Sequence, residues 1–321
     1  MQKTAPICAF DIDPSGKSTP CSDLNPALVA ALGGGYRWVH FDLNDPNLLE
    51  WFESQLPGVV AQALLQKETR PRCDGFENGI LLNLRGVNLN PNADPEDMVS
   101  LRLWVAQGLI VSARLRKVWA VDALRQQFSE NKGPKSIGEF LAVLSQALTK
   151  RIEKVSLDLE EETDSLEEQM IRDFNGLSPK VAPIRQSVIK LRRFVGPQRE
   201  ALTALASPEH EIIEEAARAR LAETANRAMR TVEELDSTRE RLAAIQDHLD
   251  VQHTIQMSRT SYALSVVATV FLPLGFITGL FGVNLAGMPG IESTGAFLIL
   301  TISCAAIGVF AFFLLKYLKW F

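Results

Sequence analysis

Formal charge is almost absent from the end of the chain. Between residues 261 and 315 the only charged residue is Glu292. Residues 1–260 carry 31 of the 33 Lys and Arg residues and 37 of the 38 Asp and Glu residues, a net charge of −6. This acidic balance argues against a nucleic-acid partner, which would need a basic surface, and it is compatible with a cationic partner.

Several other features are missing. The four cysteines are scattered and form no CxxC pair, which disfavours a disulfide framework or a zinc knuckle. "HEIIE" (210–214) lacks the second histidine of a metalloprotease helix, and there is no GxSxG motif. The sequence therefore does not predict an enzyme, and we expect no bound cofactor. The first residues lack the apolar segment of a signal peptide, so we expect the N-terminus to be cytoplasmic.

Two uncharged apolar runs of 20 residues stand out, at 262–281 and 296–315. A helix of that length spans about 30 Å, the thickness of a bilayer core. The alternative, a pair of buried core helices in a soluble protein, is disfavoured by two such runs without charge. The sequence predicts two transmembrane helices and a lipid bilayer as partner.

The flanking charges predict the orientation of these spans. Arg259 precedes the first span and Lys316 and Lys319 follow the second, whereas the loop at 282–295 has no Lys or Arg. Because basic residues stay on the cytoplasmic side, both termini, including the tail at 316–321, should be cytoplasmic and the loop should lie outside.

The preceding residues divide into three predicted regions. Residues 1–135 alternate strand-like segments (7–13, 37–43, 79–87 and 100–115) with helix-like segments (47–64 and 119–130), which predicts an α/β domain whose last two strands form a hairpin at Gln107-Gly108. Residues 136–206 predict two antiparallel helices, broken at 175–179. The acidic run at 158–168 is either a solvated face or a surface that attracts cations.

Residues 207–281 predict a stalk helix continuous with the first span. No Gly or Pro occurs between Pro208, a helix-start signal, and Pro273, and apolar residues recur at every seventh position from Leu221 to Leu249. The expected fold is thus a cytoplasmic N-terminal α/β domain and a long helical stalk that continues into the first of two C-terminal transmembrane helices.

The first span has a stripe of small and polar residues at spacings of three and four. The stripe comprises Ser258, Ser261, Ser265, Thr269, Leu272, Gly275 and Gly279. Such a stripe favours a pore lining, although small residues also allow close packing of membrane helices. Two spans cannot enclose a pore, so a pore requires several copies of the chain.

The stripe ends at a Gly-Val-Asn sequence, Gly282, Val283 and Asn284. In a ring of copies, the Asn284 amide oxygens and nearby carbonyls could hydrogen-bond a hydrated divalent cation without removing its water. By itself the Gly-Val-Asn sequence is a weak signal and predicts a simple turn at a helix end.

The segment "ATVFLPLGFITGLFGVN" (268–284), followed by "MPG" (288–290), resembles the first span and mouth of the CorA-type metal ion transporters. The stretch 79–104 is similar to the ZntB zinc-transporter branch of that family. The resemblance implies a homopentamer in the bacterial inner membrane, with a funnel-shaped cytoplasmic domain. It also implies a pore lined by the first span, with the Gly282–Asn284 signature at its outer mouth.

The resemblance further implies that the transported divalent cation is zinc, taken up with coupling to protons. Glu292 would then attract cations to the mouth, and Asn284 would contact the ion through its hydration water. His253 is a candidate zinc ligand on the stalk, although a lone histidine is more often an ordinary side chain. A magnesium or cobalt channel and a membrane-anchored sensor without transport remain alternatives.

Overall fold

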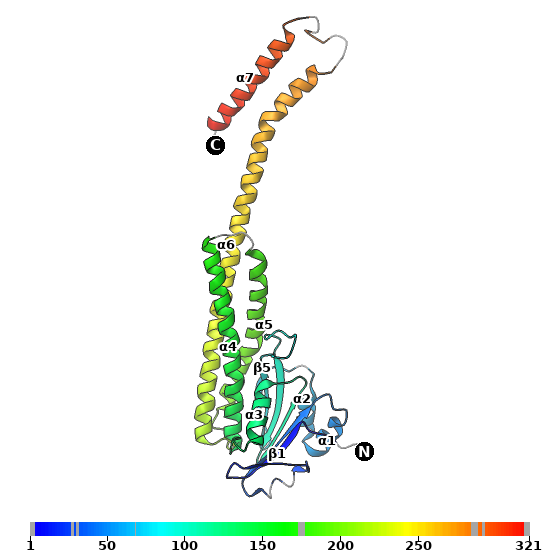
Figure 1. The fold of residues 1–321 in the computed structure, drawn as a ribbon, viewed down its shortest axis with the longest axis vertical. Helices are drawn as coiled ribbons and strands as arrows, with labels where there is room; N and C mark the ends of the chain where they lie inside the picture. Colours follow the sequence, from blue (N-terminus) through cyan, green and yellow to red (C-terminus); the bar gives the residue numbers. More distant parts are fainter. Residues whose placement is uncertain are drawn as a thin grey trace. The chain divides into compact units, whose positions relative to one another are not determined.

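The computed structural model describes residues 4–26, 29, 32–67, 69–172, 177–283, 288–290 and 293–317. The chain divides into two compact units, Met1–Gln246 and Asp247–Phe321. Helix α6 (Glu215–Phe281) contributes to both units, and α7 (Ala296–Tyr317) belongs to the second (Figure 1). The predicted continuity of the stalk with the first apolar run is confirmed.

The first unit contains a seven-stranded sheet with the order β2-β1-β3-β7-β6-β5-β4. Its strands are β1 (Cys8–Ile12), β2 (Ser18–Pro20), β3 (Tyr36–Asp42), β4 (Arg72–Phe76), β5 (Gly79–Gly86), β6 (Val99–Ala106) and β7 (Leu109–Arg114). Neighbouring strands are antiparallel except β3 and β7, which are parallel. The β6–β7 hairpin turns at Gln107-Gly108 as predicted, and Gly108 has the positive φ of 74° that such a turn favours.

Alternation along the strands supplies two apolar faces, because successive side chains in a strand point to opposite sides of the sheet. Trp38 and Leu103 belong to one buried cluster, and their neighbours Val39 and Trp104 belong to the other. The first face is covered by α3 (Trp119–Ser129) and by α4 (Ile137–Arg172) with parts of α5 and α6. The second face is covered by α1 (Leu48–Gln55) and α2 (Gly58–Leu65).

The long helices α4, α5 (Ser178–Leu205) and α6 run alongside one another in the first unit (Figure 1). The heptad predicted in α6 is visible in its burial, since Leu221, Leu235 and Leu242 are each 0% exposed. Arg239, which falls at an intervening position of the same repeat, is exposed. The apolar seam of the stalk therefore packs against helices of the same chain.

Polar side chains bridge α4 and α6 at a constant separation of 74 residues. The bridging pairs are Gln146–Arg220, Glu153–Arg227 and Glu167–Arg241. A constant separation at positions one and two heptads apart requires that the two helices run parallel and keep one register. Arg241 also pairs with Asp164, so part of the acidic run at 158–168 is engaged within the chain.

Three local predictions were wrong or incomplete. Helix α6 does not start directly after Ser207-Pro208, because residues 207–214 form turns closed by bonds such as Ile213 N–H to the His210 carbonyl. The single helical pattern expected at 47–64 is divided at Pro57, since proline has no N–H to continue the first helix. Strands β2 and β4 were not predicted, because they are short or polar edge strands.

Candidate functional site

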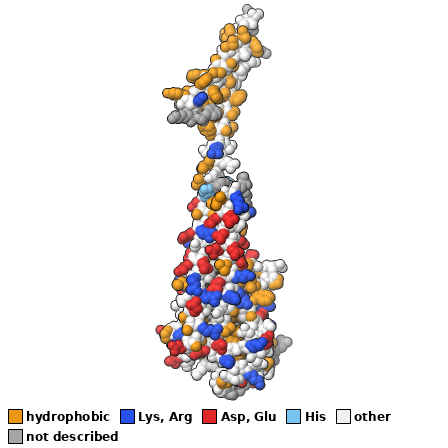
Figure 2. Space-filling view, turned by 60° about the vertical axis from the view of Figure 1, so that its left-hand side comes forward, with side chains coloured by type: hydrophobic (Ala, Val, Ile, Leu, Met, Phe, Trp, Pro, Cys, Tyr) orange, Lys and Arg blue, Asp and Glu red, His pale blue; other side chains and the backbone are white. Residues whose placement is uncertain are grey.

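The apolar part of α6 and the whole of α7 are long and apolar enough to cross a membrane. Their side chains are exposed in the chain by itself: 0% of the most apolar window of α6 and 6% of that of α7 are buried. Figure 2 shows hydrophobic side chains over these segments and charged side chains over the helices of the first unit. An apolar surface this extensive requires lipid or other helices to cover it, so these segments are not core helices buried within the single chain.

The predicted stripe lies on this exposed part of α6. Its members, Ser258, Ser261, Ser265, Thr269, Leu272, Gly275 and Gly279, all lie within the helix. The Thr269 hydroxyl donates to the Ser265 carbonyl at 2.8 Å, as helical threonines commonly do. An added Cβ at Gly275 or Gly279 would meet nothing within 4 Å, so within one chain neither glycine is required by packing.

Helix α6 ends at Phe281, directly before the predicted signature. The Gly282 N–H donates to the Gly279 carbonyl at 3.2 Å, which closes the last turn, and Val283 is 48% exposed. A Cβ on Gly282 would lie 3.0 Å from the Thr278 carbonyl oxygen, so the close turn favours glycine. Asn284 and Glu292 lie outside the described residues.

His253 lies exposed on α6. Within the described part of the chain, no group of three or more His, Cys, Asp or Glu side chains is placed to hold a metal ion, either near His253 or elsewhere. The structure therefore does not bring His253 together with further ligands, and its role as a zinc ligand stays a prediction.

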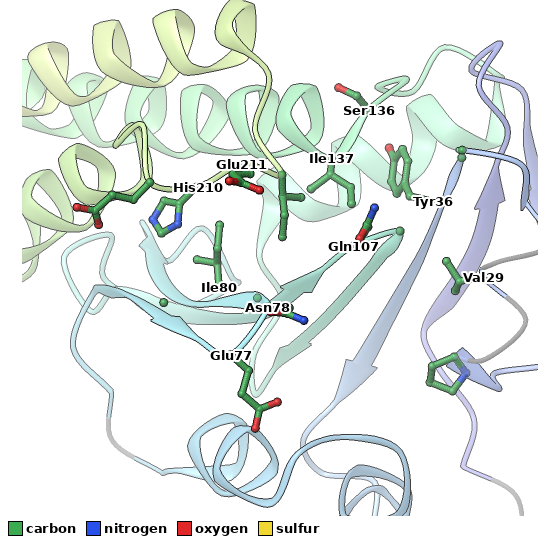
Figure 3. Close-up of a pocket in the computed structure, with 18 of the residues that line it drawn as sticks. Val29, Tyr36, Glu77, Asn78, Ile80, Gln107, Ser136, Ile137, His210 and Glu211 are labelled. Carbon is green, nitrogen blue, oxygen red and sulfur yellow. The ribbon is translucent and has the colours of Figure 1, made fainter.

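The first unit contains a cavity of 1260 Å³ that was not predicted from the sequence. It is bounded by strand ends that carry Tyr36, Ile80 and Gln107, by the start of α4, and by the loop between α5 and α6 (Figure 3). Figure 3 shows His210 and Glu211 on that loop, across from the β4–β5 turn that carries Glu77. Its lining includes three acidic residues, Glu77, Glu209 and Glu211, and the basic residue Lys135.

His210 contacts the edge strand β4 beside this cavity. Its Nε2 lies 3.8 Å from the Cys73 Sγ, and both residues are partly buried. Burial raises the pKa of the Cys73 thiol to about 12. A Cβ on Gly75 would lie 4.0 Å from the ring carbon Cε1 of His210, so the ring also packs on the strand backbone. No sequence pattern indicated this pair, because its members are 137 residues apart.

Taken together, these features define a class of membrane protein, in which an α/β domain is followed by a helical stalk and two C-terminal spanning helices. The family model of the CorA-like Mg2+ transporter proteins matches residues 33–317. The chain belongs to this family, which is one of transporters.

Individual relatives cover nearly the whole chain. The zinc transport protein ZntB of Pectobacterium atrosepticum is 32% identical over 90% of this chain and 88% of its own length. The divalent cation transporter CmaX of Pseudomonas aeruginosa is 33% identical over 88% of this chain and 87% of its own. A solved structure of a full-length CmaX protein superposes with a TM-score of 0.84 at 30% identity, covering 100% of this chain and 99% of that one.

Proposed function

We propose that this protein transports divalent metal cations across the bacterial inner membrane, with zinc as its main substrate. The observation that carries the proposal is the exposed apolar helix α6, which bears a small-residue stripe and ends directly at the Gly282–Asn284 signature. The family membership and the zinc- and divalent-cation-transporting relatives support the same substrate class.

The transporting form is a homopentamer in which five copies of α6 surround the pore. One chain supplies two spanning helices, which cannot enclose a path by themselves, and the exposed apolar windows leave surface for contact between copies. Both termini are cytoplasmic, because Arg259 and Lys316 flank the spans on the same side. Glu292 would raise the local cation concentration at the opposite, outer side.

At the mouth, Gly282, Val283 and Asn284 of each copy form a ring of neutral oxygens. Such a ring hydrogen-bonds the water shell of a divalent cation, and this suits ions that lose water slowly. Zinc prefers Cys, His or carboxylate ligands. We therefore place the selection of zinc over other divalent cations after the mouth, at a step in which a proton gradient assists entry. His253 is the candidate ligand for that step.

Metal flux into proteoliposomes tests the proposal. Purified protein would be reconstituted and supplied with zinc, magnesium or cobalt, with and without a pH gradient. Asn284→Ala should reduce zinc flux about fivefold or more, since each lost hydrogen bond to the ion's water shell is worth about 1 kcal/mol. The control Asn226→Ala alters an exposed asparagine of the first unit and should leave flux unchanged.

The outcomes separate the competing functions. Zinc flux that rises with the gradient and falls in Asn284→Ala supports the proposal. Magnesium flux that does not change with the pH gradient would instead indicate a magnesium or cobalt channel. No flux of any metal from well-folded oligomers would indicate an anchored sensor and contradict the proposal.

A matched pair of glycines tests which helix lines the path. Gly279→Val and Gly308→Val introduce the same side chain into open space on α6 and α7 respectively. The first should narrow the pore and reduce flux severalfold, whereas the second should leave flux near the wild-type rate. Equal effects would show that the stripe on α6 serves packing between helices and does not line the path.

A further inference from the structure

The Cys73–His210 pair has the geometry of two neighbouring ligands of a tetrahedral metal ion. Zinc binds Cys sulfur at about 2.3 Å and His nitrogen at about 2.05 Å, so tetrahedral geometry places the two donor atoms about 3.6 Å apart. The Sγ and Nε2 atoms lie 3.8 Å apart. A metal ion could therefore enter between them with little movement of either side chain.

The surroundings hold the two donors in place. Cys73 lies on β4, which pairs with β5 through a register that includes Cys73 and Leu82. The His210 loop is held by Arg218, whose Nη2 donates to the carbonyls of His210 at 3.4 Å and of Ile213 at 3.0 Å. The donors thus come from two separately supported elements, a sheet edge and a tight loop.

Carboxylates adjoin both donors in the sequence. Asp74 follows Cys73, and Glu209 and Glu211 flank His210, and all three are exposed. Glu209, His210 and Glu211 line the 1260 Å³ cavity, which gives an ion a route to the His210 side of the pair. None of the three stands in place as a third ligand among the described residues, so water or a rotated carboxylate would complete the coordination.

We propose that Cys73 and His210 form a binding site for a thiophilic divalent cation, zinc being the best match, at the rim of the cavity in the first unit. Sulfur and imidazole donors select zinc over magnesium, which prefers oxygen. The site is separate from the Gly282–Asn284 mouth and uses none of the residues proposed for transport.

Metal at this site would link the sheet edge to the segment that leads into α6. Residues 207–214 join α5 to α6, and α6 continues as the helix proposed to line the pore. Binding would fix the loop against β4 and thereby restrain the start of that helix. This regulatory role rests on the proposed transport function, whereas metal binding does not.

Cobalt absorption of the full-length protein tests the binding. Co2+ would be added to reduced, metal-free wild type in detergent, and thiolate-to-cobalt charge transfer would be recorded in the near ultraviolet. We expect a band that zinc abolishes and that is absent in Cys73→Ser. In His210→Asn the apparent zinc affinity should fall by more than about tenfold. Loss of a residue that only hydrogen-bonds a metal ligand already lowers the affinity by about tenfold or more.

Matched controls separate this site from the other thiols and histidines. Cys8→Ser changes another partly buried cysteine of the same sheet, and His248→Asn changes a histidine on α6. Both should keep the band, and Asn284→Ala should keep it even if its flux is lost. If tryptophan fluorescence shows that Cys73→Ser does not fold, the zinc affinity of His210→Asn, which changes a loop residue, tests the proposal instead.

Two results would overturn the proposal: no charge-transfer band in the wild type, or a band that survives unchanged in Cys73→Ser and His210→Asn. For regulation, zinc added on the cytoplasmic side should change flux in the wild type and not in His210→Asn. An identical response in both proteins would remove the regulatory role while leaving the binding result intact.

Discussion

Helix α6 places the same residue type in opposite environments in the two units. In the first unit Leu221, Leu235 and Leu242 are each 0% exposed, because helices of the chain cover them. In the second unit Leu264 is 70% and Leu272 is 72% exposed. The comparison teaches that hydrophobicity alone does not bury a leucine within a chain. In the first unit the chain itself excludes water, and in the second unit lipid or other helices must do so.

The largest expected difference between the units comes from removing a buried side chain. Leu103→Ala, in the centre of the sheet at 0% exposure, should lower the free energy of unfolding by about 2–5 kcal/mol, through lost burial and the cavity left behind. Leu298→Ala, at 64% exposure on α7, should lower it by less than about 1 kcal/mol.

Denaturant unfolding in detergent measures this difference, followed by tryptophan fluorescence for the first unit and by far-ultraviolet circular dichroism for the helices of the second. Four of the five tryptophans, Trp38, Trp51, Trp104 and Trp119, belong to the first unit and report on its unfolding. A Leu298→Ala variant as unstable as Leu103→Ala would show that α7 is packed within the protein as tightly as a core, contrary to the comparison.

A positive charge introduced into each unit should cost more free energy in the second unit than in the first, the reverse of the alanine substitutions. Ile307→Arg places a cation in the middle of α7, where membrane insertion should cost about 2.5–3.5 kcal/mol. Leu157→Arg, at 51% exposure on α4, places it in water and should cost no more than about 0.5 kcal/mol. The measurement is the yield of each variant in the membrane fraction. Equal yields would contradict the assignment of α7 to the bilayer.

The smallest of the three effects is the loss of stability of the first unit at acidic pH. His40 on β3 is buried, and burial lowers its pKa to about 3, while its Nδ1 lies 2.8 Å from the Ser112 hydroxyl. The ordinary pKa is about 6.5, so below that pH the unfolded chain binds more protons and stability falls as the pH falls toward 3. The first unit should therefore be about 2 kcal/mol less stable at pH 5 than at pH 7.

Unfolding of wild type and His40→Gln at both pH values checks this effect. The variant should show a flatter pH dependence, even if it is less stable overall. The apolar run at 262–281 contains no His, Asp, Glu, Lys or Arg, so the helical signal of the spans should persist when the tryptophan signal of the first unit is lost. An unchanged pH dependence in His40→Gln would assign the acid sensitivity to other groups.

Much of the fold was predictable because it depends on local patterns. The strands around Trp38, Leu82 and Leu103 were recognisable as runs of β-branched, aromatic and aliphatic residues, and the turn at Gly108 followed from Gln-Gly between two such runs. The position of the stripe on one helix that ends directly before Gly282 was predictable for the same reason, because these residues are close in sequence. Their part in transport stays a prediction.

The remaining features depend on contacts between distant segments. The strand order and the single parallel pair of β3 and β7 bring together residues about 70 positions apart, for example Trp38 and Ile110. The shared register of α4 and α6 rests on pairs such as Glu153–Arg227. Hydrophobic periodicity identifies which face of an element is buried but not which partner buries it.

The sequence by itself determined the membrane-spanning helices, the continuity of α6 and the family, because the absence of charge over 20 residues and a contiguous signature are local properties. The tertiary structure alone decided which helices cover each face of the sheet, the cavity beside the α5–α6 loop, and the contact between Cys73 and His210. Those features arise when folding brings distant segments together, and no pattern within either segment specifies the other.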